Sequence, residues 1–449
     1  MVGNPEDMGR TVSNASGYAP EDDEFDPQID DFVSKERKYL HFDLPLTEAR
    51  RTDLSFSADD LRRHSFWPLL AFDDVERRVK KDDKGETIFE EKARPIKFAA
   101  HLDAALFEWY SKVLGEAYES RLEDEPFADS ILAYRGGVGS NITHAKGLFD
   151  EISHRGECTA IAVDVSGFFD NIDHRILKAN LTEVLKADPL AEHDYRIFRR
   201  MTRFSWVESD EVQARLGGDY GKRGRICSPA RFRELVRSKS ASLVKENPHP
   251  YGIPQGTPLS GLYANISMLG VDAELYGYIR SLRGSYRRYS DDIAIVIPGA
   301  IDPTSAVDKV EEILNGVGLK LSGHKTETSS FSILGDRLLA NKPFQYLGFT
   351  FDGERKLIRQ SSLNRYYTKM HNGIRAKVRA AKNKGVPRNE IYLRELYRRY
   401  THFGRARNFP RYAYRSARLL EAPEIRNQLR NHMATFRDAL KYYLDRAYG

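Results

Sequence analysis

Three aspartates stand at the ends of apolar runs, where a buried strand would ordinarily hold apolar side chains. Asp164 follows the run 159–163, which is typical of a strand buried on both faces, and Asp291 and Asp292 directly precede the run 293–297. A lone buried carboxylate is costly, and two adjacent carboxylates repel each other. A bound cation would neutralise both arrangements, although an ion-paired core aspartate or an ordinary acidic turn is the alternative interpretation of each.

The chemistry that suits these residue types is two-metal phosphoryl transfer. Three carboxylates can hold two Mg²⁺ ions about 3.5–4 Å apart. Mg²⁺ prefers hard oxygen ligands and keeps some of its waters, so few protein ligands suffice. Displacement at phosphorus mainly requires positioning and charge neutralisation, which such a site supplies.

The motifs around these aspartates resemble those of reverse transcriptases. Tyr289-Ser290-Asp291-Asp292 is similar to the family's Tyr-x-Asp-Asp box, and Asp164-Val-Ser-Gly-Phe-Phe-Asp170 is similar to its first palm motif. The other similar segments are two finger motifs (94–96 and 133–135), a Pro-Gln-Gly motif (252–260), a palm lysine motif (319–326) and the strand that grips the primer (344–349). All seven follow the family's order over roughly residues 90–350, and the resemblance implies an RNA-directed DNA polymerase, a nucleotidyltransferase.

The resemblance also implies roles for single residues. Asp164, Asp291 and Asp292 would be catalytic and would bind two Mg²⁺ ions, for which Mn²⁺ can substitute, with the Val165 carbonyl as a further ligand. Phe169 would exclude a ribose 2′-hydroxyl and so favour dNTPs, while core packing is the alternative for one of Phe168 and Phe169. Gln255 and Gly256 would line the nucleotide pocket. Arg94, Lys97 and Arg135 are the candidates for binding the triphosphate; Arg94 is the best of them, and a surface charge is the alternative for Lys97 and Arg135. Lys325 would protonate the leaving pyrophosphate, with a solvated lysine as the alternative.

The C-terminal segment 355–449 is strongly basic, and its cations alternate with tyrosines. It holds 24 Lys and Arg against 6 Asp and Glu, a balance of +18 in a chain whose net charge is +5, and it holds ten of the 24 tyrosines. Cations contact phosphates and tyrosines can stack on bases, although a solvated basic face is the alternative. The segment matches the family's thumb in position, and the predicted nucleic-acid contacts are Tyr289, Tyr346, Gly348, Arg365, Arg398, Arg399 and Arg411.

We therefore predict an α+β right-hand polymerase with fingers, a palm with an antiparallel sheet, and a helical thumb. The predicted parts are an acidic arm (1–31), an N-terminal and fingers region (32–155), a palm (156–354) with a finger insertion at about 186–250, and a basic helical thumb (355–449). The pattern of apolar residues predicts helices over 101–119, 173–185, 261–282 and 305–317, and a helix start at Ser57. It predicts two strands within 286–297, joined at Ser290-Asp291, and a strand over 344–351. Turn-forming and polar residues predict a hairpin tip at 80–85, loops over 208–250, and breaks near 385–387 and 408–410 in the helices beyond 361.

Cysteine content and hydropathy limit the class of protein and the cellular compartment that the sequence fits. Two cysteines cannot form a disulfide framework or a four-thiolate zinc site, and no stretch approaches the ~18 apolar residues that would span a bilayer. No secretory signal is visible, so we expect a soluble, cytoplasmic protein with no membrane partner.

The wording of the motifs is most similar to the bacterial stand-alone reverse transcriptases that include abortive-infection and phage-defence members. This resemblance implies cDNA synthesis in antiphage defence. The implied partners are an RNA template, for which an associated noncoding RNA is the candidate, dNTPs and a DNA product, and self-association is left open. The alternatives are an untemplated or protein-primed DNA polymerase of the same family and a catalytically idle RNA-binding scaffold. The presence of all three carboxylates weighs against idleness.

Overall fold

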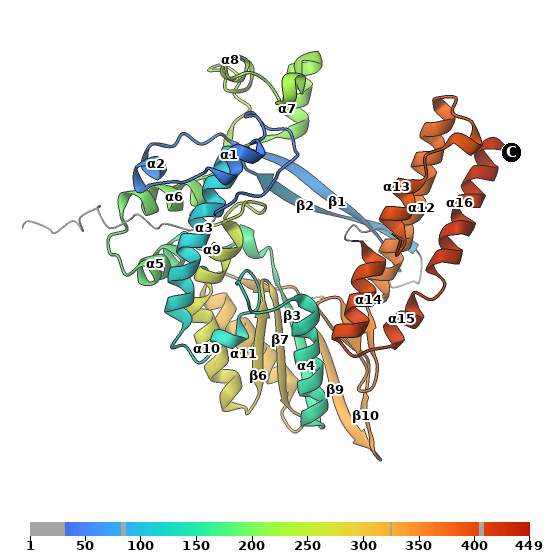
Figure 1. The fold of residues 1–449 in the computed structure, drawn as a ribbon. Helices are drawn as coiled ribbons and strands as arrows, with labels where there is room; N and C mark the ends of the chain where they lie inside the picture. Colours follow the sequence, from blue (N-terminus) through green and yellow to red (C-terminus); the bar gives the residue numbers. More distant parts are fainter. Residues whose placement is uncertain (1–31, 82–86, 324–325, 404–407) are drawn as a thin grey trace, which may run out of the picture. The chain divides into compact units, whose positions relative to one another are not determined.

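The computed structural model describes residues 32–81, 87–323, 326–403 and 408–449, and the chain forms two compact units (Figure 1). The first unit comprises Met1–Leu114 and Thr182–Pro248, and the second comprises Gly115–Leu181 and His249–Gly449. The predicted acidic arm, 1–31, lies outside the described residues. The division falls within two helices, α3 (His101–Leu122) and α5 (His174–Leu185), which cover the predicted helices 101–119 and 173–185.

The first unit is built on a four-stranded sheet. The strand order is β2-β1-β4-β5, with β1 (Leu69–Lys81), β2 (Thr87–Phe98), β4 (Ser205–Glu208) and β5 (Lys245–Glu246). β1 and β2 pair antiparallel along their whole length, from Leu70 opposite Phe98 to Lys81 opposite Thr87. This pairing confirms the predicted hairpin, whose tip, 82–86, is outside the described residues.

Short helices complete the first unit. They are α1 (Glu48–Thr52), α2 (Ala58–Arg63), α6 (Glu192–Thr202), α7 (Ser209–Leu216) and α8 (Pro229–Arg231). α2 begins as predicted at Ser57, whose hydroxyl accepts from the Asp60 amide while the Asp60 carboxylate accepts from the Ser57 amide. The prediction of loops over 208–250 was wrong for α7, which buries Val212 and Leu216.

The second unit contains a six-stranded antiparallel sheet. Its order is β10-β9-β3-β7-β6, and β8 pairs with the end of β3. The strands are β3 (Cys158–Ser166), β6 (Ser285–Tyr289), β7 (Asp292–Pro298), β8 (Lys320–Leu321), β9 (Glu327–Leu334) and β10 (Arg337–Ala340). β3 and β7 lie at the centre, which explains their apolar sequences and confirms the two strands predicted on either side of Ser290-Asp291.

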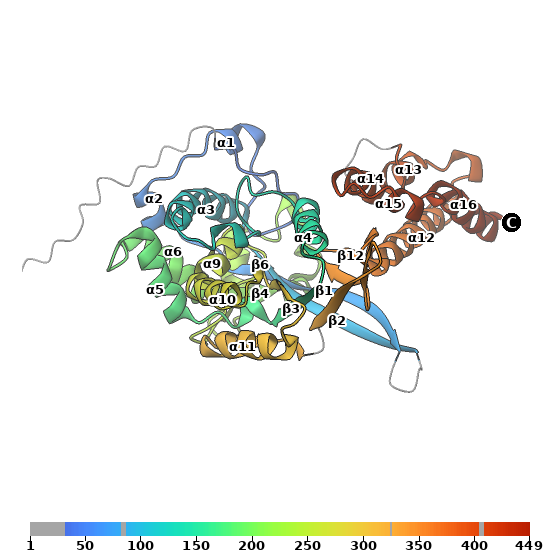
Figure 2. The same cartoon turned by 90° about the horizontal axis from the view of Figure 1, so that it is seen from below.

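Helices cover both faces of this sheet. Side chains alternate between the faces, and α4 (Asn141–Arg155) packs its buried Ala145, Leu148 and Phe149 into the cluster that contains Ala160 and Ala294. Figure 2 shows α11 (Pro303–Gly316) on the opposite side of the sheet from α4. The predicted single helix 261–282 is two helices, α9 (Ser260–Ser267) and α10 (Leu269–Ser281), which meet at Met268, where ψ is 0°.

A second correction concerns the predicted strand 344–351. The segment forms a hairpin, β11 (Phe344–Tyr346) and β12 (Phe349–Phe351), and β12 also pairs with β13 (Lys356–Ile358). The two turn residues, Leu347 and Gly348, have φ of +46° and +91°. Two consecutive positive φ values are what a two-residue hairpin turn of type I′ requires, and leucine gives little sequence signal for that conformation.

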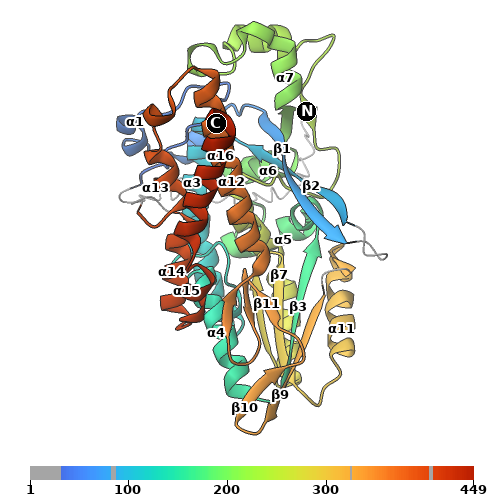
Figure 3. The ribbon, with the colours of Figure 1, turned by 90° about the vertical axis from the view of Figure 1, so that its right-hand side faces the viewer.

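The predicted breaks near 385–387 and 408–410 are present, and two breaks that were not predicted lie at 420–423 and 429–431. The chain therefore ends in a series of helices. They are α12 (Gln360–Asn383), α13 (Arg394–Tyr400), α14 (Phe409–Leu419), α15 (Glu424–Gln428) and α16 (His432–Tyr448). α12 presents Tyr366, Met370, Ile374 and Val378 to a buried cluster shared with α13 and α16, and Figure 3 shows α12 and α16 side by side. None of the helices in the described ranges has the length and apolar character needed to cross a membrane.

Candidate active site

Strand pairing places two of the three predicted metal ligands, Asp164 and Asp292, opposite each other, although 128 positions of sequence separate them. Asp164 on β3 lies directly opposite Asp292 on β7, and Asp291 occupies the turn that precedes β7. The Val165 amide donates to the Asp291 carbonyl at 3.0 Å. Because directly opposed residues of an antiparallel pair place their side chains on one face, Asp164 and Asp292 share one face at the end of the strands.

Asp164 is held by a residue from a third strand region. The Ser322 hydroxyl donates to Oδ2 of Asp164 at 2.8 Å, and the Ser322 amide donates to the Asp164 carbonyl at 2.8 Å. Asp164 and Asp291 are half-buried, and Asp292 is exposed. Sequence reasoning did not assign this role to Ser322, because its pairing with Asp164 depends on β8 folding beside β3.

The donor set suits a hard divalent cation. Carboxylate oxygens are the ligands that Mg²⁺ prefers, and two of the carboxylates face each other across the ladder. Within the described ranges, however, no three His, Cys, Asp or Glu side chains are gathered closely enough to form one metal site. Like charges oppose such a gathering until a cation is bound. Val165, whose carbonyl was predicted as a ligand, is buried and pairs with Leu321 of β8.

The turn that carries Asp291 has an unusual backbone. Ser290 has φ of +62° and is 5% exposed. A non-glycine residue in this region costs on the order of 1–3 kcal/mol and persists where surrounding contacts impose it. One such contact is a hydrogen bond between the Ser290 and Tyr134 hydroxyls at 3.1 Å. Tyr134, which sequence reasoning did not single out as a site residue, is 53% exposed beside the turn.

The predicted sugar discriminator lies beside the Pro-Gln-Gly segment. Phe168 is buried at 3% exposure, whereas Phe169 is half-buried, so Phe168 is the ring of the pair that packs in the core. The Ile253 amide donates to the Phe169 carbonyl at 2.9 Å. The segment continues to Gln255, which is half-buried, and Gly256, which is exposed. The structure therefore brings Phe169 together with the segment that holds Gln255 and Gly256.

A glycine is required where this segment approaches the first palm motif. Gly252 has φ of +88°, and a Cβ atom there would lie 2.9 Å from the Asp170 carbonyl oxygen. The Gly252 amide donates to the Ile172 carbonyl at 2.8 Å, and its carbonyl accepts from Nε2 of His174 at 2.7 Å. These contacts fix the segment against the turn that carries Phe169.

The predicted triphosphate ligands differ in their surroundings. Arg94 is exposed on β2 opposite Asp74, and the Lys97 ammonium lies 5.4 Å from the Trp206 ring centroid, both within the first unit. Arg135 belongs to the second unit, and its guanidinium donates to both Glu119 carboxylate oxygens. A contact of Arg135 with a triphosphate would require it to leave Glu119. Lys325 lies outside the described residues.

The predicted contacts near the primer are mainly backbone and buried rings. Tyr346 is 4% exposed within the core, and burial raises the pKa of its hydroxyl well above the usual value, so its ring has no face open for stacking. Gly348 is half-buried in the hairpin turn. Tyr289, at the end of β6, is half-buried, with its ring centroid 6.2 Å from that of His144.

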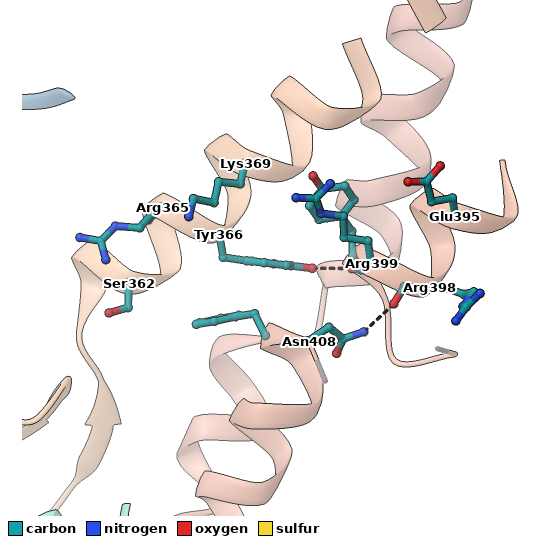
Figure 4. Close-up of a pocket in the computed structure, with 10 residues that line it drawn as sticks. Ser362, Arg365, Tyr366, Lys369, Glu395, Arg398, Arg399 and Asn408 are labelled. Carbon is teal, nitrogen blue, oxygen red and sulfur yellow. Dashed lines mark hydrogen bonds between the residues drawn. The ribbon is translucent and has the colours of Figure 1, made fainter. Parts of the chain in front are cut away.

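The C-terminal helices form an open cavity of about 650 Å³ with a cationic rim (Figure 4). Arg365, Arg398 and Arg399 all line it and are exposed. Its floor includes Tyr366, whose ring stacks on Phe409 at 4.7 Å. The fourth cation predicted on these helices, Arg411, is exposed near the start of α14. The structure therefore gathers three of the predicted nucleic-acid-binding arginines around one hollow.

Comparison with known protein families gives one match. The family model described as "Reverse transcriptase (RNA-dependent DNA polymerase)" matches residues 90–351, which is more than half of the chain. Together with the antiparallel sheet and the C-terminal helices, the match shows an α+β right-hand polymerase fold. No curated protein matches the sequence.

Telomerases from two Candida species are among the solved structures that align with this chain. The apo telomerase from Candida tropicalis is 10% identical with a TM-score of 0.43, and the alignment covers 84% of this chain and 62% of that one. The telomerase from Candida albicans, solved with a fragment of telomeric RNA, is 11% identical with a TM-score of 0.39, and the alignment covers 86% of this chain and 65% of that one. The chain thus spans less than two thirds of the length of each.

Proposed function

Because this chain belongs to the reverse transcriptase family, we propose that it is an RNA-directed DNA polymerase that adds dNTPs by two-metal phosphoryl transfer. The observation that carries the proposal is the position of Asp164 directly opposite Asp292 on paired central strands, with Asp291 in the adjoining turn. Polymerisation on a template requires carboxylates at the meeting point of primer end and incoming triphosphate, and these three residues are the candidates.

In this proposal each residue acts through its own chemistry. Asp164, Asp291 and Asp292 would hold two Mg²⁺ ions, and bound Mg²⁺ lowers the pKa of an attacking hydroxyl and neutralises the triphosphate. Ser322 keeps the Asp164 carboxylate oriented through its 2.8 Å hydrogen bond. Arg94, Lys97 and Arg135 remain the proposed contacts of the triphosphate, with Arg94 favoured by its exposure. Lys325 remains the proposed proton donor to the leaving pyrophosphate.

Selection of the sugar is assigned to Phe169. Phe169 is half-buried, so part of it would be accessible to a bound nucleotide. A ribose 2′-hydroxyl would collide with that ring, whereas a deoxyribose would fit. Gln255 and Gly256 would line the base and sugar, because their segment is bonded to the Phe169 carbonyl through Ile253.

The C-terminal helices are proposed as the thumb that holds the nucleic acid. The exposed arginines 365, 398 and 399 around the cavity, and Arg411 on α14, would contact phosphates. Tyr346 is buried and contributes to the shape of the adjoining hairpin, leaving Gly348 and Tyr289 as the nearer candidates for the primer.

Primer extension tests the proposal. We would supply an RNA template, a labelled DNA primer, dNTPs and Mg²⁺ to the wild type, to the Asp291→Ala/Asp292→Ala variant and to a matched control, Asp170→Ala, whose exposed carboxylate lies on the same palm motif. We expect synthesis by the wild type and the control and none by the double variant. Absence of dNTP incorporation by the wild type, on every supplied or copurifying template, would refute the proposal.

The same reactions distinguish the two alternatives from the sequence. Product sequence that is independent of the template would identify an untemplated polymerase, and DNA that stays with the protein during phenol extraction would identify protein priming. RNA binding without incorporation would identify a scaffold.

The biological setting is a separate proposal that rests on the wording of the motifs. We propose cytoplasmic cDNA synthesis on an associated noncoding RNA in antiphage defence. Phage plating on cells that express the wild type or the Asp291→Ala/Asp292→Ala variant tests it. Equal plating on both strains, across a broad phage panel, would count against a defence role and leave the polymerase proposal intact.

A further inference from the structure

A fully buried guanidinium lies beneath the turn that carries Asp291. Arg288 is on β6, two positions before Ser290, and its side chain and that of its partner Asp272 on α10 are both 0% exposed. A buried charge is costly unless it is paired and hydrogen-bonded. Neither residue takes part in the chemistry proposed above, so the buried pair calls for another role.

The guanidinium is bonded along both of its edges. Nε and Nη2 of Arg288 donate to the two Asp272 oxygens at 2.7 and 2.6 Å, a bidentate pairing that fixes the plane of the group. Nη1 donates to Oδ1 of Asn265 at 3.1 Å and to the Ser290 carbonyl at 3.3 Å. The Tyr286 hydroxyl donates to Asp272 at 2.7 Å. Arg288 therefore connects α9 and α10 to the turn.

The Ser290 backbone depends on contacts of this kind. Its φ of +62° is uncommon for a residue with a side chain. Arg288 contacts its carbonyl, and Tyr134 contacts its hydroxyl at 3.1 Å. The segment that carries Tyr134 is bonded to the same group of residues, because the Asn265 amide nitrogen donates to the Ala133 carbonyl at 2.8 Å.

We propose that Arg288 and Asp272 are positioning residues that preset the Ser290–Asp291 turn and thereby the spacing of Asp291 and Asp292 from Asp164. This proposal rests on the proposed function of the three carboxylates. A turn without its support would sample other backbone conformations, and the carboxylates would meet a divalent cation in the productive arrangement less often. Without the Arg288–Asp272 pair, a higher concentration of the divalent cation is needed for activity, and the affinity for nucleic acid changes little.

The informative variant is Arg288→Met/Asp272→Leu. Removing one partner leaves an unpaired buried charge, whereas replacing both with apolar residues is often neutral or stabilising. The double variant therefore separates the loss of the Ser290 contact from the loss of the fold. Arg288→Lys is the second variant, because it keeps a charge beside Asp272 but cannot bond along two edges.

The matched control is Arg287→Met. Arg287 is the neighbouring residue on β6, is half-buried, and pairs with Glu151 of α4 at 2.9 Å. It therefore tests the loss of an arginine and an ion pair from the same strand without a contact to Ser290. Thermal melting would establish that each variant is folded before any comparison.

Two measurements test the role. The first is Mn²⁺ binding by electron paramagnetic resonance without nucleotide, and the second is the Mg²⁺ concentration that gives half-maximal primer extension. Residues that support metal ligands typically affect metal affinity by 10–100-fold. We therefore expect the Mn²⁺ dissociation constant and the half-maximal Mg²⁺ concentration to rise roughly 10-fold in Arg288→Met/Asp272→Leu and in Arg288→Lys. Neither value should change in Arg287→Met. The RNA affinity should stay unchanged in all three.

The outcomes are separable. Folded variants with wild-type Mn²⁺ binding and wild-type Mg²⁺ dependence would overturn the positioning role. If the double variant does not fold, Arg288→Lys alone decides between the same two results. If the wild type synthesises no DNA, the proposed function fails, and the Mn²⁺ measurement still shows whether the buried pair sets the geometry of the carboxylates.

Discussion

Gly252→Ala adds a single methyl group at the point where the Pro-Gln-Gly segment meets the first palm motif. The new Cβ would lie 2.9 Å from the Asp170 carbonyl oxygen, and the position has φ of +88°. The atom that it meets belongs to the backbone, so no side-chain rotation relieves the contact. Either the backbone at Asp170 or the backbone at Gly252 must shift.

The cost has two parts. A non-glycine residue held at positive φ costs on the order of 1–3 kcal/mol, and forcing a group into a close-packed site costs roughly 1–3 kcal/mol. Since relaxation relieves both together, we expect the variant to lose about 2–4 kcal/mol of unfolding free energy. For a unit of this size 1 kcal/mol corresponds to about 2–4 °C, so the melting temperature should fall by roughly 4–16 °C.

Thermal denaturation followed by circular dichroism measures this change, and Gly270→Ala is the matched control. Gly270 lies exposed within α10, and nothing lies within 4 Å of a Cβ atom placed there. Alanine favours a helix over glycine by about 0.5–1 kcal/mol, so the control should be slightly more stable than the wild type.

The same variant should also affect catalysis. The segment is bonded to the Phe169 carbonyl through the Ile253 amide at 2.9 Å, so a shift at Gly252 moves the proposed sugar discriminator. We expect a raised KM for dNTPs at temperatures where the variant is folded. A melting temperature equal to or above that of the wild type would refute the steric argument, and an unchanged KM would refute the link to Phe169.

Three further predictions follow from single side chains. Phe169→Ala should raise the use of ribonucleotides relative to deoxyribonucleotides by about 10–100-fold in competitive primer extension, since one steric contact is typically worth that much; unchanged discrimination would remove Phe169 from the site. Arg399→Ala should make the negative slope of log affinity against log salt shallower by roughly 0.7–0.9, as expected for one lost phosphate contact. The change should be the same for every nucleic-acid sequence, and an unchanged slope in filter binding would contradict it. Burial, with the nearby His101 charge, lowers the pKa of His41 from 6.5 to about 3. The unfolded chain therefore binds a proton first as pH falls, and stability should decline below pH 6.5 by about 1 kcal/mol per pH unit until about pH 3. His41→Asn should flatten this decline in melting curves at pH 7 and 5.5, and an equally steep decline in the variant would assign it to other groups.

The local pattern of apolar residues was sufficient to predict the two strands that carry the site. The apolar run before Asp164 predicted β3, and the apolar run after Asp292 predicted β7, because a strand buried on both faces leaves a continuous apolar signature. The order of the motifs also predicted the family that the family model matches over 90–351. Catalytic motifs that consist of given residue types at fixed spacing can therefore be recognised in the sequence without the structure.

Errors arose where the deciding interaction is distant in sequence. The break at Met268 and the turn at Leu347-Gly348 involve apolar residues, Met268 and Leu347, whose types do not signal a break or a turn. The burial of Tyr346 depends on helices from beyond residue 360. Periodicity reports which residues are apolar, and it does not report which partner covers them.

The sequence alone determined which residues could do chemistry: three carboxylates, a bulky ring after the first, and a basic end suited to a polyanion. Only the tertiary structure decided that Asp164 faces Asp292, that Ser322 holds Asp164, and that a buried Arg288–Asp272 pair supports Ser290. The physical reason is that strand register and buried pairing are set by long-range packing. A carboxylate's role depends on the atoms that packing brings within hydrogen-bond distance.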